Sequence, residues 1–227
     1  MKHDGVHGIP TQGTVVLIHG LWMRGWEMRL LGRRIKQSGF KVCYFSYPSI
    51  RRSVSDNAQQ LSNFLRALPA WQQAPQDVHL VCHSLGGLVS LTMLHRDPTL
   101  RLGRVVAIGS PFYGSWIAKK LSRGPLKIFF GKSMHNGLGG GGPDSVPEQR
   151  EIAVIAGSIG SKFTPLYWLR SLFYKGLPKP NDGTVTVAET QLIGTSWHRT
   201  IALNHMALLF PRTIAEWIVE WLIQQRQ

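Results

Sequence analysis

Short runs of apolar residues alternate along the chain with longer segments in which apolar residues recur every three or four positions. The runs are typical of buried strands in a parallel sheet, because neither face of such a strand meets water. The longer segments are typical of helices that bury one face. Strands are predicted at 15–18, 41–48, 78–83, 104–111, 151–158 and 197–203, and helices at 26–37, 55–68 and 85–96. This alternation predicts an α/β fold, with a mostly parallel central sheet covered by helices on both faces.

Two segments interrupt the alternation. Residues 131–143 are too rich in glycine to hold a helix, and residues 162–177 carry five aromatic side chains outside the strand pattern. We expect both to be insertions above the sheet that serve as cap or lid elements. A chain of 227 residues is long enough for one domain with a substantial core and short for two, so a single domain over residues 1–227 is expected.

The charge balance favours anionic partners. The chain has 26 Lys and Arg against 12 Asp and Glu, and no acidic residue occurs between Pro98 and Pro143. The basic residues of that stretch are Arg101, Arg104, Lys119, Lys120, Arg123, Lys127 and Lys132. They predict a positive face suited to the headgroups of an anionic membrane, with a solvated face of no specific role as the equal alternative. Nucleic acid is not expected as a partner, because no helix-turn-helix, zinc module or stacking platform accompanies the charge.

The cysteine count and the apolar runs exclude further classes. Only Cys43 and Cys82 occur, so neither a disulfide framework nor a paired-cysteine zinc site is indicated, and no metal or cofactor is expected. The first residues lack the apolar region of a signal peptide, and no run approaches the roughly 18 apolar residues of a spanning helix. We therefore expect a soluble protein that is cytoplasmic or peripheral to a membrane.

The stretch HLVCHSLGGLVSL, at residues 79–91, carries the clearest chemical signal. Ser84 stands where the strand 78–83 must turn sharply into the helix 85–96, which lifts its hydroxyl clear of the sheet and makes it a candidate nucleophile. The backbone N–H of Leu85, at the helix N-terminus, can face a developing oxyanion. Close packing of this helix explains Gly86, whereas Cys82 occupies the place of the first glycine in the pattern G-x-S-x-G.

With this elbow, the passages VVLIHGLW (15–22), GSPFYGS (109–115) and NDGTVTVAET (181–190) resemble the α/β-hydrolase superfamily. The resemblance is closest to its small bacterial lipases and esterases and to the GPI-inositol-deacylase-like branch, and it extends from about Thr14 to Trp221. It implies that the strands of Cys43 and Cys82 flank the strand 15–18. The two thiols would then lie roughly 9 to 10 Å apart, beyond the reach of a disulfide, and both should be free.

The resemblance also implies a catalytic triad in the order serine, acid, histidine, which assigns Asp182 and His205 to Ser84. His205 follows the last predicted strand, and Asp182 follows the strand 151–158, as the family's acid usually does. The rival histidines are His83 in the elbow, His135 in the glycine-rich segment and His198 within the last strand, and the rival acids are Asp97 and Asp144. Asp97 should face away from the site, and Asp144 precedes the strand 151–158.

The loop that follows the first strand is expected to supply the second oxyanion donor, the backbone N–H of Leu21, by the same resemblance. His19 is expected to brace this loop by hydrogen bonds. Trp22, Tyr167 and Trp168 are candidates for substrate binding. Aromatic residues at the spacing of Trp22 and Trp26 are nevertheless more typical of a core.

These features favour a serine hydrolase that cleaves a small-molecule or lipid carboxylic ester through an acyl-enzyme on Ser84. An acyltransferase or a thioesterase would use the same triad, and a non-catalytic α/β-hydrolase fold that binds a lipid or a partner protein is a further alternative. A nucleotide-binding protein is disfavoured, because GLGGGGP lacks the Gly-Lys-Ser/Thr ending of a phosphate loop.

Overall fold

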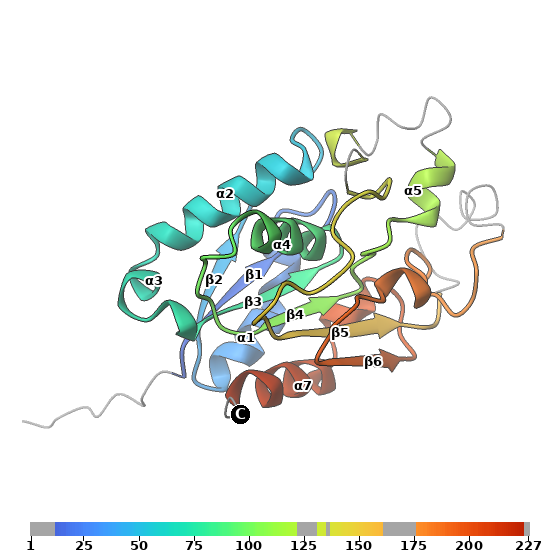
Figure 1. Ribbon diagram of the computed structural model, residues 1–227. Coiled ribbons are helices and arrows are strands. Elements are labelled where there is room, and N and C mark those ends of the chain that lie inside the picture. Colours follow the sequence, from blue (N-terminus) through green and yellow to red (C-terminus); the bar gives the residue numbers. More distant parts are fainter. Residues whose placement is uncertain (1–11, 122–130, 135–136, 161–175, 225–227) are drawn as a thin grey trace, which may run out of the picture.

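The computed structural model describes residues 12–121, 131–134, 137–160 and 176–224, and its centre is a parallel sheet (Figure 1). The strands are β1 (Thr14–Ile18), β2 (Lys41–Phe45), β3 (Val78–His83), β4 (Val105–Ile108), β5 (Ile152–Gly157) and β6 (Trp197–Ile201). They are ordered β2-β1-β3-β4-β5-β6, and every neighbouring pair is parallel. The predicted α/β class and parallel sheet are confirmed.

Helices cover both faces of the sheet, as Figure 1 shows. The helices of the described residues are α1 (Arg29–Gln37), α2 (Val54–Ala67), α3 (Pro69–Gln73), α4 (Leu85–Arg96), α5 (Trp116–Leu121), which lies beyond the ends of the strands, and α7 (Arg212–Ile223). Alternate residues of each strand point to opposite faces. Val16 and Ile18 accordingly join the core beneath α2 and α4, whereas Val15 and Leu17 join the core beneath α1 and α7.

Several predicted bounds need correction. The strand predicted at 41–48 ends at Phe45, because its partner β1 ends at the paired residue Ile18. The helix predicted from Ser55 begins at Val54, after a capping box in which the Ser53 hydroxyl and the Asp56 carboxylate each accept the other residue's N–H. Residues 131–134 form a 3-10 turn within the segment expected to lack a helix. The helices α3, α5 and α7 were not predicted.

The cysteines lie where the sheet order requires. Cys43 pairs with Val16 from one side of β1, and Cys82 pairs with Ile18 from the other. Both are free thiols. The predicted separation by two strand spacings is confirmed.

Arg104 does not belong to the predicted basic face, because its side chain is buried. Its guanidinium donates to the carbonyl oxygens of Trp221 and Gln224 at the end of α7 and to the Glu151 carboxylate. It also lies 4.6 Å from the ring centre of Trp221. Arg104 thus fastens the last helix to the sheet. Arg123 and Lys127 lie outside the described residues.

Candidate active site

Ser84 occupies a strained turn between β3 and α4. Its backbone angles are φ 53° and ψ −121°, a region that residues with a side chain rarely adopt. Its N–H donates to the carbonyl of Ile108 at the end of β4, at 2.8 Å, which holds the turn in place. Strain of this kind persists where the surrounding structure fixes it, and it is characteristic of functional sites. The expectation of a strained serine at the elbow is confirmed.

The elbow helix packs closely against the end of β1. A Cβ on Gly86 would lie 2.6 Å from the carbonyl oxygen of Ile18 and 2.7 Å from that of His19. A Cβ on Gly20, in the loop after β1, would lie 3.0 Å from the Cβ of Ser84. Glycine at these positions therefore lets the loop after β1 reach the serine.

Asp182 and His205 form a tight buried pair. The Nδ1 of His205 lies 2.6 Å from Asp182 Oδ2, and the side chain of Asp182 is 1% exposed. Asp182 Oδ1 accepts hydrogen bonds from the N–H groups of Thr184 and Val185, at 2.8 and 2.7 Å. The backbone N–H of His205 also donates to the Asp182 carbonyl. A carboxylate held in this way can fix the tautomer and orientation of an imidazole.

The same sheet edge carries the serine and the histidine. Ser84 is bonded to Ile108, and the next residue, Gly109, lies against the His205 ring: a Cβ on Gly109 would be 3.1 Å from His205 Nδ1 and Cε1. The structure thus brings Ser84, Asp182 and His205 to the carboxyl ends of the strands, where open parallel sheets bind ligands.

Two backbone N–H groups, one in the loop after β1 and one directly after Ser84, have no hydrogen-bond acceptor among the described residues. Among the residues that the structure describes, no acceptor is bonded to the N–H of Leu21 or to that of Leu85. Leu85 is the first residue of α4, where N–H groups have no partner within the helix. These are the two donors that the sequence assigns to an oxyanion.

His19 braces the loop that carries Leu21. Its Nδ1 is 2.8 Å from the Gly20 carbonyl, which accepts from Nδ1–H, and its Nε2 accepts from the Tyr47 N–H at 3.2 Å. The Tyr47 hydroxyl donates to the His19 carbonyl, and the two rings stack with centres 4.3 Å apart. Burial lowers the pKa of His19, which favours the neutral ring that these bonds require.

His83 contacts the backbone of His205, a role that the sequence did not indicate. Its Nε2 is 3.2 Å from the His205 carbonyl, and the two ring centres are 4.7 Å apart. Burial, and then the proximity of His205, holds the pKa of His83 well below its ordinary value. His83 is therefore a neutral donor that supports the position of His205.

The rival residues occupy other places. His198 is hydrogen bonded to the Thr190 hydroxyl, Asp97 is paired with Arg66, and Asp144 is exposed. Asp97 follows the last residue of α4 and so lies at the other end of that helix from Ser84, as expected. His135 lies outside the described residues.

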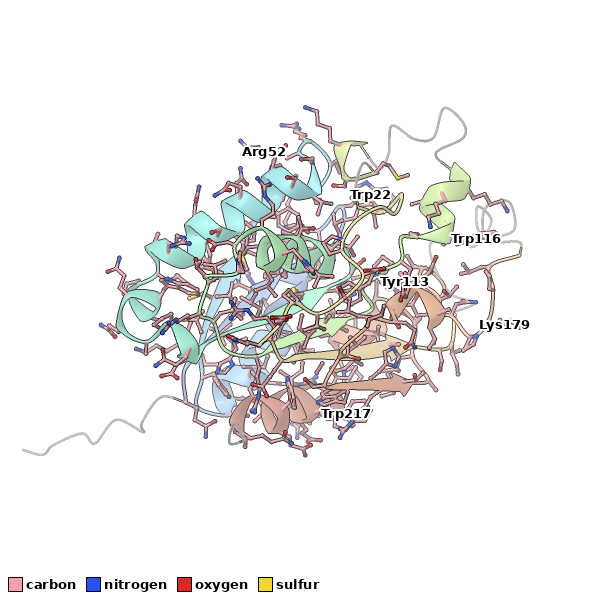
Figure 2. All side chains as sticks on the ribbon, viewed as in Figure 1. Trp22, Arg52, Tyr113, Trp116, Lys179 and Trp217 are labelled. Atoms are coloured by element: carbon pink, nitrogen blue, oxygen red, sulfur yellow. The ribbon has the colours of Figure 1, made fainter. Side chains whose placement is uncertain are left out.

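The aromatic residues considered for substrate binding lie partly within and partly outside the described residues. Trp22 is 56% exposed and Trp26 63% exposed, so the interpretation of these two rings as core is wrong. In Figure 2, Trp22 and Tyr113 lie toward the side to which the strands point, whereas Trp217 lies on α7. Tyr167 and Trp168 lie outside the residues that the structure describes.

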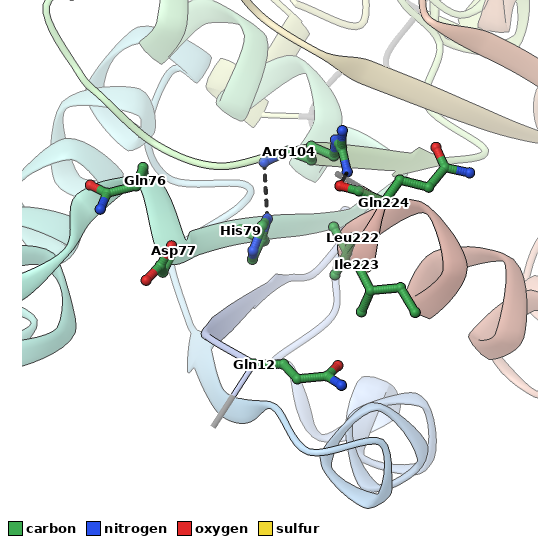
Figure 3. Close-up of a pocket in the computed structure, with 8 residues that line it drawn as sticks. All are labelled: Gln12, Gln76, Asp77, His79, Arg104, Leu222, Ile223 and Gln224. Carbon is green, nitrogen blue, oxygen red and sulfur yellow. Dashed lines mark hydrogen bonds between the residues drawn. The ribbon is translucent and has the colours of Figure 1, made fainter. Parts of the chain in front are cut away.

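A hollow of about 420 Å³ lies at the amino ends of the strands, between Asp77, His79 and the end of α7 (Figure 3). It lies at the opposite end of β3 from Ser84. The His79 ring there accepts a hydrogen bond from the Arg104 N–H at 3.0 Å, so it serves the fold.

Within the described ranges, no three His, Cys, Asp or Glu side chains are grouped so as to hold a metal ion. The helices in those ranges also lack the length and apolar character needed to cross a bilayer.

The sheet order, the strained serine and the carboxylate-bonded histidine define an α/β protein of the hydrolase type. Residues 15–220 match the model of the alpha/beta hydrolase family, and the chain belongs to that family.

Solved structures with the same fold include two bacterial lipolytic enzymes. The mature lipase BlEst2 of Bacillus licheniformis superposes with a TM-score of 0.74 at 21% identity, over 96% of this chain and 95% of that chain. Phospholipase PlaB of Legionella pneumophila superposes with a TM-score of 0.67 at 16% identity, over 93% of this chain and 60% of that one. At these identities the likeness shows a shared fold.

Mammalian sequences are similar over a shorter region. The human lysosomal thioesterase PPT2 is 30% identical over 105 residues, which are 45% of this chain and 35% of that protein. The thioesterase of the same name from Bos taurus is 28% identical over 127 residues, 55% of this chain and 40% of that protein. The match thus spans well under half the length of these relatives.

Proposed function

We propose that the protein is a serine hydrolase that cleaves carboxylic esters through an acyl-enzyme on Ser84. The observation that carries the proposal is the 2.6 Å contact between His205 and a buried Asp182 at the sheet edge where Ser84 is strained. A weak nucleophile such as a hydroxyl needs a base, and that base needs an orienting carboxylate.

In the proposed reaction, His205 Nε2 removes the proton of Ser84 as Oγ attacks the ester carbonyl. The negative charge on the carbonyl oxygen is met by the N–H groups of Leu21 and Leu85. The tetrahedral intermediate then collapses, and His205 returns the proton to the departing alcohol. A water molecule, deprotonated by His205, cleaves the acyl-enzyme in the same manner. Asp182 accepts from Nδ1–H throughout and stabilises the imidazolium.

Lipid esters are the proposed substrates. Exposed apolar side chains follow the strands at this edge: Trp22 after β1, Tyr113 after β4 and Met206 after β6. Exposed basic residues also follow the strands in the chain: Arg52 lies between β2 and α2, and Lys179 lies between β5 and β6. Such a rim suits acyl chains and anionic headgroups. We accordingly propose that the protein binds peripherally to anionic membranes. Binding to vesicles that depends neither on their anionic lipid content nor on the salt concentration would contradict this proposal.

Thioester hydrolysis is a second candidate, favoured by the similarity to proteins named thioesterases. The same residues would act, since only the leaving atom differs. A comparison of an octanoyl p-nitrophenyl ester with an octanoyl thioester, each by kcat/KM, decides between the two.

The central test uses p-nitrophenyl acetate, butyrate and laurate with the native protein, Ser84→Ala and Ser46→Ala. Ser46 is exposed, so its variant controls for loss of a serine hydroxyl. Turnover should fall by about 10⁴-fold or more in Ser84→Ala and stay unchanged in Ser46→Ala. A fluorophosphonate probe should label Ser84 and fail after His205→Ala. Equal turnover in the native protein and Ser84→Ala on every ester would exclude the proposal.

A further inference from the structure

Glu189 is a buried carboxylate seven residues beyond Asp182, in the 3-10 turn Ala188–Thr190. Both of its oxygens accept backbone hydrogen bonds. Oε2 accepts from the N–H of Thr186 at 2.6 Å, and Oε1 accepts from the N–H of Trp116, the first residue of α5. One carboxylate thus bridges its own turn and a helix that lies 73 residues earlier in the chain.

A second contact joins the same two segments. The carbonyl of Glu189 accepts from the N–H of Tyr113 at 3.3 Å. Tyr113 lies in the loop that leaves β4 through Gly109, Trp116 begins the helix α5 that follows this loop, and Gly109 lies against the His205 ring. The segment that follows Gly109 is therefore tied to the turn Ala188–Thr190, which follows Asp182 in the chain.

The Glu189 carboxylate forms no salt bridge within the described part of the chain. Burial raises its pKa, the N–H bonds from Thr186 and Trp116 lower it, and the nearby charge of Asp182 raises it further. Since an electrostatic interaction is mutual, Glu189 also acts on Asp182, the hydrogen-bond partner of His205. The other titratable ring against His205 is His83, which is neutral.

We propose that Glu189 is a positioning residue for the proposed triad. Its ionised carboxylate fastens the segment after Gly109 to the segment 182–190 that carries Asp182, and its negative charge favours the protonated form of His205 that each acyl-transfer step creates. This inference rests on the proposed function and adds a residue to it. A neutral amide cannot replace the carboxylate, because it offers one acceptor atom to two N–H donors.

The test compares Glu189→Gln, which removes the charge, with Glu189→Asp, which keeps the charge and shortens the reach. Glu148→Gln is the matched control, since Glu148 is exposed. The pKa of the His205 ring is measured by NMR titration, which requires no turnover, and kcat/KM for p-nitrophenyl butyrate is measured against pH.

Loss of a nearby negative charge destabilises the imidazolium. The midpoint of the His205 NMR titration and the acid limb of kcat/KM should therefore both move to lower pH in Glu189→Gln. Both should stay in place in Glu189→Asp and Glu148→Gln. Amide exchange at Trp116 should accelerate on the order of tenfold in Glu189→Asp, because the shorter side chain no longer reaches it.

The failures are distinguishable. A native protein that turns over no ester refutes the proposed function, while the NMR titration still reports whether the charge reaches His205. An active protein whose His205 pKa and acid limb are the same in Glu189→Gln and Glu148→Gln refutes the positioning role. Failure of both Glu189 variants to fold would also overturn it, because the carboxylate would then be a requirement of the fold.

Discussion

Substitution of Gly86 and Gly87, the first two glycines of α4, tests how closely this helix packs at the candidate site. A methyl group at Gly86 would meet the backbone carbonyls of Ile18 and His19 at 2.6 and 2.7 Å. A methyl group at Gly87 would meet Ser110 instead, at 2.2 Å from Oγ and 2.5 Å from Cβ. The first obstacle is main chain, and the second is one small side chain.

The size of the effect follows from this difference. Overpacking a tight site costs about 3 kcal/mol, and replacing glycine by alanine within a helix returns up to about 1 kcal/mol. Gly86→Ala should therefore lose about 2 kcal/mol of stability, equivalent to a fall in Tm of roughly 4 to 8 °C. Turnover should fall on the order of 100-fold, because the displaced carbonyls immediately precede the Gly20–Leu21 loop.

A double-mutant cycle with Ser110→Gly separates the two glycines. The Ser110 hydroxyl has no hydrogen-bond partner among the described residues, so its removal sacrifices no such bond there. Unfolding in urea should show Gly87→Ala rescued by Ser110→Gly and Gly86→Ala not rescued. Native stability and turnover in Gly86→Ala, or rescue of both variants by Ser110→Gly, would refute the packing argument.

Three further outcomes are expected. Burial lowers the pKa values of His19 and His83 below 6.5, so below about pH 6.5 the unfolded chain binds more protons than the folded chain. The free energy of unfolding should therefore fall there by up to about 1.4 kcal/mol per pH unit per histidine. A free energy of unfolding in urea that does not change with pH would contradict this. Cys82 is fully buried with its pKa raised to about 12, so a thiol reagent should modify Cys43 in the native protein and Cys82 only after unfolding. Arg104→Met should lower the free energy of unfolding by about 2 to 4 kcal/mol, because the carbonyls at the end of α7 lose their donor; an unchanged urea midpoint would count against that role.

The elements next to the serine could be predicted closely from the sequence. The strand 78–83 and the helix 85–96 have the bounds that were predicted, because the apolar run changes to helical spacing within two residues of Ser84. The strand predicted at 41–48 was too long. Its apolar pattern continues to Tyr47, which packs on His19 after pairing with β1 has ended. Burial of a side chain and membership of the sheet differ at that point.

Other features depend on contacts that no local pattern records. The helix α7 did leave a signal, since Pro211 precedes apolar residues at Ile214, Ile218 and Leu222. The bond from His83 to the His205 carbonyl and the bond from Glu189 to α5 left none, because their partners lie 122 and 73 residues away in the chain. Burial of a carboxylate or an imidazole becomes visible only when those distant partners are in place.

The cysteine at the first position of the elbow motif illustrates how such contacts resolve a departure from a pattern. Cys82 is fully buried, and its Sγ lies 3.0 Å from the Oγ of Ser90 on α4. The Ser90 hydroxyl donates to the Gly86 carbonyl at 2.9 Å, so the thiol must donate to Ser90, as a group with a pKa near 12 can. A small side chain on the helix thus leaves room for the sulfur beneath it. Glycine is strictly required at Gly86, because a Cβ there would meet the main chain of β1. At Cys82, the first position of G-x-S-x-G, the small side chain of Ser90 leaves the space that a glycine would otherwise provide.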